Sequence, residues 1–186
     1  HWAYRRDSMP GGALLEGGIH LIDICNYLLG RPIAVNAVLR RRITPGESED
    51  SCAILCRYQA PGDTSEGYFS DIPVSILCST SAPSTNLIRV SGSRANAVIS
   101  DRQTELVLEQ ADGQRSPCLI PTPFDAFQTL SSRRQELDEF AYCIRTGMAP
   151  ETDGICGLKA LAVVEAAILA NGKGGEVFID ELGLAF

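Results

Sequence analysis

Aromatic residues, histidine and basic runs are scarce in this chain of 186 residues. Only 6% of the residues are aromatic, there are two histidines, and the one basic run is Arg40, Arg41 and Arg42. The formal net charge is −7 at pH 7, from 16 Lys and Arg against 23 Asp and Glu. This acidity argues against a nucleic-acid-binding role, which requires clustered positive charge. A basic run of this length is more typical of a solvated strand end.

Long hydrophobic runs are missing as well. No uninterrupted apolar run reaches the ~20 residues that a helix needs to span a bilayer, so we expect no membrane partner. With 45% hydrophobic and 21% charged residues, the composition is that of an ordinary globular protein, which excludes disorder as the main state. The chain opens without an initiator Met or a signal peptide, and we expect it to be a piece of something longer.

Signals for disulfides and metals are weak. The seven cysteines are an odd number, no CxxC pair occurs, and most of them lie in apolar segments. We expect them to be reduced and packed as small hydrophobic residues in a cytoplasmic protein, with a disulfide framework as the weaker alternative. No metal site is expected, because HExxH is absent and no third or fourth ligand stands out.

Three segments are predicted to be helical. Apolar residues recur at helical spacing from about residue 12 to 29, and Gly30 is a typical C-terminal stop. A long helix is expected over residues 124–146, and a third over residues 154–170 with Asp153 as its N-cap. Because the third helix is apolar on all sides, we expect it to be buried.

The middle of the chain is predicted to be a meander of strands. Apolar and β-branched stretches are separated by short turns, which indicates antiparallel pairing. The expected strands are residues 33–42, 52–59, 67–71, 74–80, 86–91, 97–100, 104–109 and 176–180, with a proline-rich connector at 117–123. This order predicts a single α+β domain over residues 1–186, with an open, mostly antiparallel sheet and helices on one face. The other face is then polar, or is covered by another domain or subunit.

Acidic and imidazole side chains follow one line along the first predicted helix. Glu16 and His20 are four residues apart, which brings their side chains to one face, and Asp23 continues that line. A carboxylate beside an imidazole orients the ring and stabilises its charge, an arrangement suited to general acid/base catalysis. Gly17 and Gly18 each cost ~0.5–1 kcal/mol in a helix relative to Ala, which indicates close approach of a ligand or another backbone. A surface ion pair is the simpler alternative for the Glu16–His20 spacing.

Two stretches resemble a known family. Residues 11–23, GGALLEGGIHLID, closely resemble the GGxxxDxGxHxxD signature of the Gfo/Idh/MocA oxidoreductases. Residues 136–147, followed by Asp153-Gly154 and residues 158–161, resemble the closing helices of the same family, and the strand-rich middle fits its sheet domain. The resemblance covers both ends of the chain and implies the C-terminal domain of a two-domain, Rossmann-containing dehydrogenase.

The resemblance implies much about the whole protein. NAD or NADP would be bound mainly by an N-terminal Rossmann domain upstream of His1, because these residues lack a GxGxxG that opens a helix after a strand. Hydride would pass between the nicotinamide and a carbon of a sugar, polyol or related substrate, assisted by a Lys in an upstream Lys-Pro motif. The α+β domain would supply the substrate pocket and, through its open sheet face, a homodimer or homotetramer interface. By itself, this chain is expected to be inactive.

The resemblance also assigns roles by position. His20 matches the acid/base histidine of the family, and Glu16 matches an Asp that contacts substrate or polarises the catalytic groups. Asp23 is expected to bind substrate with them, to orient His20 or to bond backbone, and Gly17 and Gly18 to leave room near the nicotinamide. Glu16 in place of Asp moves the carboxylate by roughly 1.5 Å, the length of one C–C bond, which bears on substrate choice.

Two alternatives remain open. Some relatives are NAD-dependent glycosidases. Cofactor that stays bound through purification, with no net formation of NADH, would favour this alternative. Others are non-catalytic regulatory or scaffolding proteins. The line of Glu16, His20 and Asp23 argues against that reading, and a missing upstream Lys would argue for it.

Overall fold

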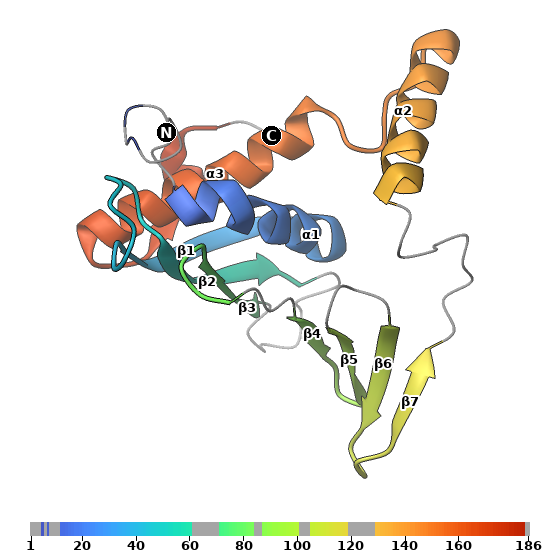
Figure 1. Ribbon diagram of the computed structural model, residues 1–186, viewed down its shortest axis with the longest axis horizontal. Helices are drawn as coiled ribbons and strands as arrows, with labels where there is room; N and C mark the ends of the chain where they lie inside the picture. The colour runs from blue at the N-terminus through green and yellow to red at the C-terminus, as the bar shows by residue number, and fades with distance from the viewer. Residues whose placement is uncertain are drawn as a thin grey trace. The chain divides into compact units, whose positions relative to one another are not determined.

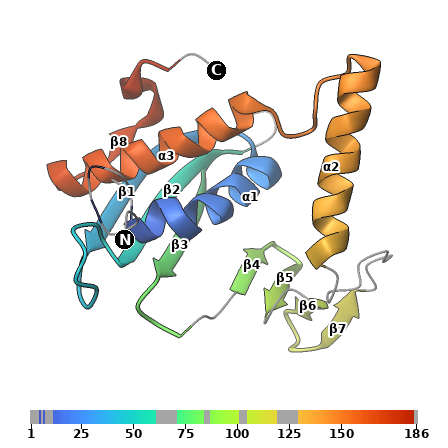
Figure 2. The ribbon, with the colours of Figure 1, turned by 45° about the horizontal axis from the view of Figure 1, so that its top comes forward.

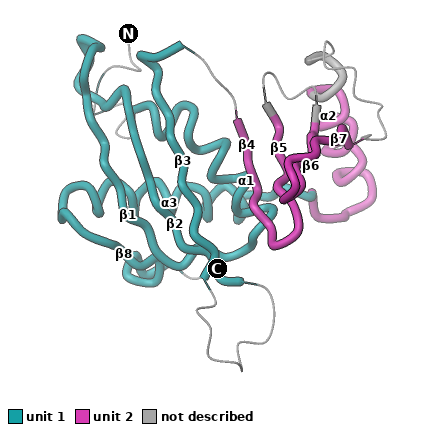
Figure 3. Tube along the Cα trace, turned by 90° about the horizontal axis from the view of Figure 1, so that it is seen from below, with its two compact units in different colours: residues 1–83, 151–186 teal, residues 84–150 magenta. Residues whose placement is uncertain are grey.

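The chain folds into two compact units. The computed structural model describes residues 12–60, 71–83, 87–100, 105–118 and 129–184, together with Arg5 and Asp7. Unit 1 comprises residues 1–83 and 151–186, and unit 2 comprises residues 84–150 (Figure 3). Each combines antiparallel strands with helix, which confirms the α+β class.

Unit 1 is built on a four-stranded antiparallel sheet of order β3-β2-β1-β8 (Figure 1). Its strands are β1 (Pro32–Arg40), β2 (Ser51–Gln59), β3 (Asp71–Ser79) and β8 (Val177–Phe178). The three long strands confirm the segments expected at 33–42, 52–59 and 74–80. Most of the strand expected at 67–71 lies outside the described residues. The closing strand is shorter than expected, because Ile179–Leu182 forms a 3-10 turn.

Two helices lie on one face of this sheet (Figures 1 and 2). They are α1 (Ile19–Leu29), which is preceded by a π-helical turn at Leu14–Gly18, and α3 (Gly154–Lys173). Asp153 is the N-cap of α3, as expected, since its Oδ1 accepts the N–H groups of Ile155 and Cys156 at 2.9 and 3.0 Å. Small buried side chains on α3, such as Ala166 and Ala167, let the helix pack closely on β1.

Helix α3 is the one helix in the described ranges that is long and apolar enough to cross a membrane by length and composition. Helix α3 meets this criterion although it contains Lys159 and Glu165. The lack of an uninterrupted apolar run in the sequence therefore does not exclude a helix of membrane-spanning length and composition. The core helix of a globular unit passes the same test. Seven residues of α3 are buried in the core of unit 1, so the expected burial is confirmed for one side of the helix. The other side is not buried, since Ile155, Leu161 and Leu169 are 47%, 47% and 44% exposed.

Unit 2 has a second four-stranded sheet, of order β4-β5-β6-β7, in place of a continuation of the first. It consists of β4 (Leu87–Ser91), β5 (Ala95–Ser100), β6 (Glu105–Gln110) and β7 (Arg115–Cys118), and is followed by α2 (Thr129–Thr146). The expectation of a single sheet is therefore corrected. The last two residues of β7 fall in the connector that was expected at 117–123. Pro117 is tolerated there because β7 is an edge strand, where no ladder donor is needed on the outer side. Residues 119–128, including the expected start of the helix, lie outside the described residues.

A buried carboxylate organises the connection between β1 and β2. Asp50 is only 1% exposed, and it accepts hydrogen bonds from the backbone N–H groups of Ile43, Thr44 and Arg42 and from the hydroxyls of Thr44 and Ser51. The bond from the Ile43 N–H is the largest of the contributions that lower the pKa of Asp50 well below its ordinary value. The charged carboxylate thus holds this loop in place.

Replacing Asp50 with Asn is expected to lower the Tm at pH 7 and to weaken the acid sensitivity of the fold. Because the folded-state pKa is depressed, the carboxylate stabilises fully above the unfolded-state pKa of about 3.9 and loses this contribution as the pH falls toward the folded value. Thermal unfolding at neutral pH and near pH ~3 measures the difference. Asp138→Asn, at an exposed side chain, is the control and should lose as much Tm between the two pH values as wild type does. If Asp50→Asn also loses as much Tm as wild type, the Asp50 carboxylate is not the source of the acid sensitivity.

Candidate functional site

The signature segment begins with an unusual turn. The helix expected over residues 12–29 is confirmed in extent, but Leu14–Gly18 is π-helical and only Ile19–Leu29 is α-helical. Leu14 and Gly18 are buried, whereas Glu16 and Gly17 are exposed. Single π turns are rare and frequently occur at functional sites.

A residue from the β1–β2 connection fixes the start of this turn. The backbone oxygen of Glu49 accepts the N–H of Ala13 at 3.0 Å, and its Oε1 accepts the N–H of Leu14 at 3.2 Å. Gly12 has a φ of +40°, and a Cβ there would lie 2.2 Å from the Glu49 backbone oxygen. Both the backbone conformation and the close approach therefore require glycine. Sequence reasoning missed Glu49, whose only signal was an acidic residue in a predicted turn.

The two glycines of the turn have different surroundings. A Cβ on Gly18 would lie 2.8 Å from Leu14 Cδ1 and 3.3 Å from the Sγ of Cys78 on β3, so the missing side chain lets the helix approach the sheet. A Cβ on Gly17 would meet no atom within 4 Å. Gly17 thus leaves open space on the outer side of the turn, whereas Gly18 faces the core of unit 1.

The three polar residues of the signature are available to a ligand. Glu16 and His20 are exposed, and Asp23 is half-buried. Within the part of the chain that the structure describes, no hydrogen bond or ion pair engages the side chain of Glu16, His20 or Asp23. The structure therefore presents these groups in order along the helix, without internal partners.

Asp23 lines a pocket of about 320 Å³ at the C-terminal end of α1. The other lining residues come from the end of α1, the start of β1 and the start of α3 with the loop before it, and are Ile24, Asn26, Tyr27, Gly30, Arg31, Pro32, Glu151, Thr152, Cys156 and Lys159. Two carboxylates and two cationic side chains thus border one small cavity. Its volume is in the range of small-molecule sites, about 300–1,000 Å³.

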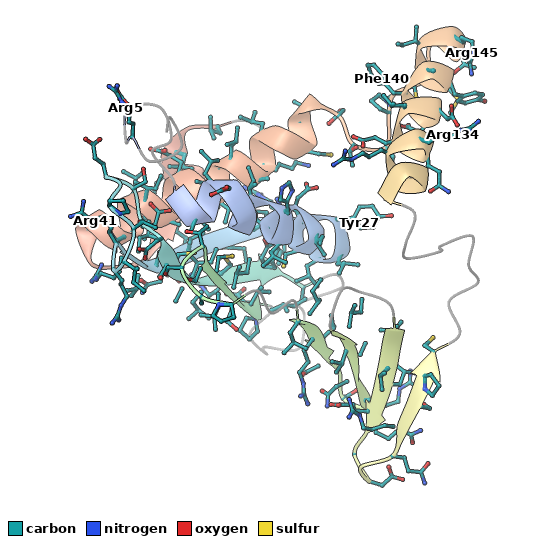
Figure 4. All side chains as sticks on the ribbon, viewed as in Figure 1. Arg5, Tyr27, Arg41, Arg134, Phe140 and Arg145 are labelled. Atoms are coloured by element: carbon teal, nitrogen blue, oxygen red, sulfur yellow. The ribbon has the colours of Figure 1, made fainter. Side chains whose placement is uncertain are left out.

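Two tyrosines contribute polar contacts at this pocket. Tyr27 projects from the end of α1 (Figure 4), and its hydroxyl donates to Glu151 Oε1 at 3.1 Å, a bond that raises the pKa of Tyr27. The buried Tyr58 hydroxyl donates to Asn26 Oδ1 at 2.9 Å. The Nδ2 of Asn26 is buried and has no hydrogen-bond partner among the described residues. The sequence alone could not indicate Glu151 as the partner of Tyr27, because 124 positions separate the two residues.

Comparison with known proteins identifies the family. The family model described as "Oxidoreductase family, C-terminal alpha/beta domain", that of the Gfo/Idh/MocA proteins, matches residues 2–179. A curated relative, D-apiose dehydrogenase from Paraburkholderia graminis, is 27% identical over 175 residues, which cover 89% of this chain and 44% of that protein.

Solved structures share the fold. A levoglucosan dehydrogenase in complex with NADH and levoglucosan superposes with a TM-score of 0.77 at 20% identity, covering 96% of this chain and 53% of that one. An oxidoreductase from Agrobacterium radiobacter in complex with NAD+, L-tartaric acid and magnesium gives a TM-score of 0.70 at 20% identity, covering 96% and 56%. This chain spans about half the length of the proteins it matches. The match over residues 2–179 means that the chain belongs to the Gfo/Idh/MocA oxidoreductase family, as its C-terminal α/β domain.

Proposed function

We propose that this chain is the substrate-binding part of an NAD- or NADP-dependent dehydrogenase that acts on a sugar, polyol or related compound. The observation that carries the proposal is the signature helix, on which His20 and Glu16 are exposed and Asp23 borders a polar pocket. The names of two relatives, D-apiose dehydrogenase and levoglucosan dehydrogenase, support a sugar as substrate. Two carboxylates and two cations around one pocket also suit a polyol, whose hydroxyls both donate and accept hydrogen bonds.

His20 is assigned the acid/base role. In the oxidative direction the imidazole accepts the proton of the substrate hydroxyl as the hydride leaves the same carbon, and in the reductive direction it returns that proton. Glu16, one turn earlier, contacts the substrate or polarises the reacting groups, and Asp23 binds substrate hydroxyls in the pocket. The nicotinamide, when bound, accepts or supplies the hydride.

The surroundings of the turn fit a nicotinamide. Gly17 has no side chain, and the space where its Cβ would lie is open on the exposed side of the π turn. A flat ring could therefore approach the backbone closely there. We assign Gly17 to the cofactor-facing surface and the remainder of the dinucleotide to an N-terminal Rossmann domain of the whole protein. Gly18, expected to lie near the nicotinamide as well, faces the core of unit 1 instead.

A second copy of the chain is the proposed partner for the open sheet face. Val38, Leu55 and Leu77 are 51%, 53% and 74% exposed. The register of β1, β2 and β3 puts their side chains on the same face, opposite α1 and α3. An exposed apolar patch of this kind is typical of a subunit interface and supports a homodimer or homotetramer. The seven free cysteines support a cytoplasmic location.

A panel of pentoses, anhydrosugars and polyols, each tested with NAD+ and with NADP+, is the experiment that tests this function. We expect the full-length protein to reduce the cofactor with at least one sugar, at a kcat on the order of 1–1,000 s⁻¹. The 186-residue chain alone is the control and should not turn over. Tightly bound cofactor with sugar hydrolysis and no net NADH would instead favour the glycosidase alternative. Absence of turnover over the whole panel, in a protein that lacks the upstream Lys, would favour a regulatory relative.

A further inference from the structure

Cys52 and Cys78 face each other beneath the signature helix. They are direct partners in the register of β2 and β3. Cys52 is only 6% exposed, whereas Cys78 is partly exposed and lies under Gly18. The register puts both thiols on the same face of the sheet, the face that the helices cover. The sequence showed only scattered cysteines, because this pair forms across strands.

The register brings the two cysteines within disulfide range. The N–H of Thr80 donates to the backbone oxygen of Asp50 at 2.9 Å, so these two groups point toward each other across the strands. Hydrogen-bonded and non-hydrogen-bonded positions alternate along antiparallel strands, so Cys52 and Cys78, two residues further along, occupy a hydrogen-bonded position. The Cα atoms of such a pair are about 5.5 Å apart. Disulfides accept Cα separations of about 4.4–6.8 Å, so the Cα spacing of this pair permits a bridge.

The same position makes the bond reversible. The Cβ atoms of a hydrogen-bonded cross-strand pair are about 5.5 Å apart, at the far end of the range for opposed residues. Disulfides prefer a Cβ separation of about 3.8 Å, so the two strands must move slightly toward each other at this point and the bond is strained. Strained disulfides are more readily reduced than structural ones.

The two thiols differ in reactivity. The hydrogen bond with Cys52 lowers the pKa of Cys78, while the same interaction, together with burial, raises the pKa of Cys52. Because the thiolate is the nucleophile, the partly exposed Cys78 reacts first and the buried Cys52 resolves. A second neighbouring pair lacks this asymmetry: burial raises the pKa of Cys56 to about 12, with a further contribution from Cys25, whose own pKa is raised by burial.

We propose that Cys52 and Cys78 form a reversible oxidation site, at which a hydroperoxide converts the two thiols to a cross-strand disulfide. The Cys78 sulfur attacks the peroxide O–O bond and becomes a sulfenic acid, and with hydrogen peroxide one water leaves. The Cys52 sulfur then displaces the sulfenic hydroxyl as a second water and forms the S–S bond. The two thiols lose two hydrogens and two electrons, which reduce one peroxide to two waters. A dithiol reductant reverses the reaction.

Oxidation at this site reaches the signature turn through Gly18. The Cys78 sulfur lies 3.3 Å from the position that a Gly18 Cβ would occupy, so it forms the floor beneath the π turn. Closing the S–S bond draws this sulfur toward β2 and removes that support. The turn carries Glu16 and leads into His20, so the disulfide is expected to lower turnover. This last effect alone rests on the proposed function.

Peptide mapping of the full-length protein tests the site without any activity measurement. The native protein is treated with stoichiometric hydrogen peroxide, alkylated and digested. We expect a Cys52–Cys78 cross-linked peptide, lighter by about 2 Da than its two thiol forms, that disappears on treatment with dithiothreitol. Cys52→Ala and Cys78→Ala should each abolish the cross-link, and Cys25→Ala, in the neighbouring pair, should keep it.

The peptide map of the wild-type protein shows whether Cys52 and Cys78 form a disulfide even if a variant folds poorly. Persistent alkylation of both Cys52 and Cys78, while the exposed Cys118 is oxidised, would overturn the proposal. So would a cross-link that forms only after unfolding in urea. A cross-link without any sugar oxidation in the earlier panel would leave the oxidation site standing and remove only its link to turnover.

Discussion

Given the acid/base role proposed for His20, its replacement with Asn is expected to lower the kcat of the full-length protein by about 10²–10⁴-fold, the usual contribution of a positioned acid/base group. Asn keeps a polar side chain of similar reach on the exposed face of α1, but it cannot take up the hydroxyl proton as the hydride leaves. Since His20 has no internal hydrogen bond to lose among the described residues, the fold should be unaffected. Steady-state kinetics with the best sugar of the panel measures the effect.

The pattern of kinetic constants separates catalysis from binding. A group that acts on the proton in transit lowers kcat and kcat/KM together, whereas a group that only holds substrate raises KM. Leu28→Ala, at an exposed position on the same helix, is the control and should retain the wild-type kcat. A His20→Asn enzyme with a kcat within about threefold of wild type would remove His20 from the chemistry.

The elements predicted best from the sequence are those fixed by neighbouring residues. Asp153 caps α3 through its own next residues, and the three long strands of unit 1 follow their apolar and β-branched content. The π turn was not predicted, because five residues such as Leu14–Gly18 are too few to distinguish its period from that of an α-helix. Strand β7 was not predicted, because a proline such as Pro117 is more typical of a connector than of a strand.

The features that escaped prediction depend on residues far apart in the chain. Glu49 bonds to the start of the signature turn, and Glu151 accepts from Tyr27 across 124 positions. The pairing of Cys52 with Cys78 likewise needs the register of two strands. The signature named Glu16, His20 and Asp23 from a local pattern, but neither the pocket beside Asp23 nor the support beneath Gly18 has a local signal.

Gly12 and Gly17 should respond to the same substitution in opposite directions. Gly12→Ala is expected to destabilise the protein by about 2–5 kcal/mol, from roughly 1–2 kcal/mol for a Cβ at positive φ and 1–3 kcal/mol for crowding against Glu49. The Cβ would lie 2.2 Å from a backbone oxygen that already accepts the Ala13 N–H, so relief requires breaking that bond. Gly17→Ala has open space and an ordinary helical φ, and should stabilise by up to ~1 kcal/mol.

Urea unfolding of the two variants and wild type measures both changes, provided the slope m stays constant. Because the substitution is the same, the added methyl group contributes equally to both variants. The difference between their free energies of unfolding then reports the local backbone conformation and the close approach of Glu49. If Gly12→Ala fails to fold, the expected sign is met, and Glu49→Gln then gives the graded measurement. That variant keeps an oxygen for the Leu14 N–H and the backbone bond to Ala13, so it should lose far less stability than Gly12→Ala. Equal stability of Gly12→Ala and Gly17→Ala would mean that the chain does not enter the signature turn through a left-handed glycine against Glu49.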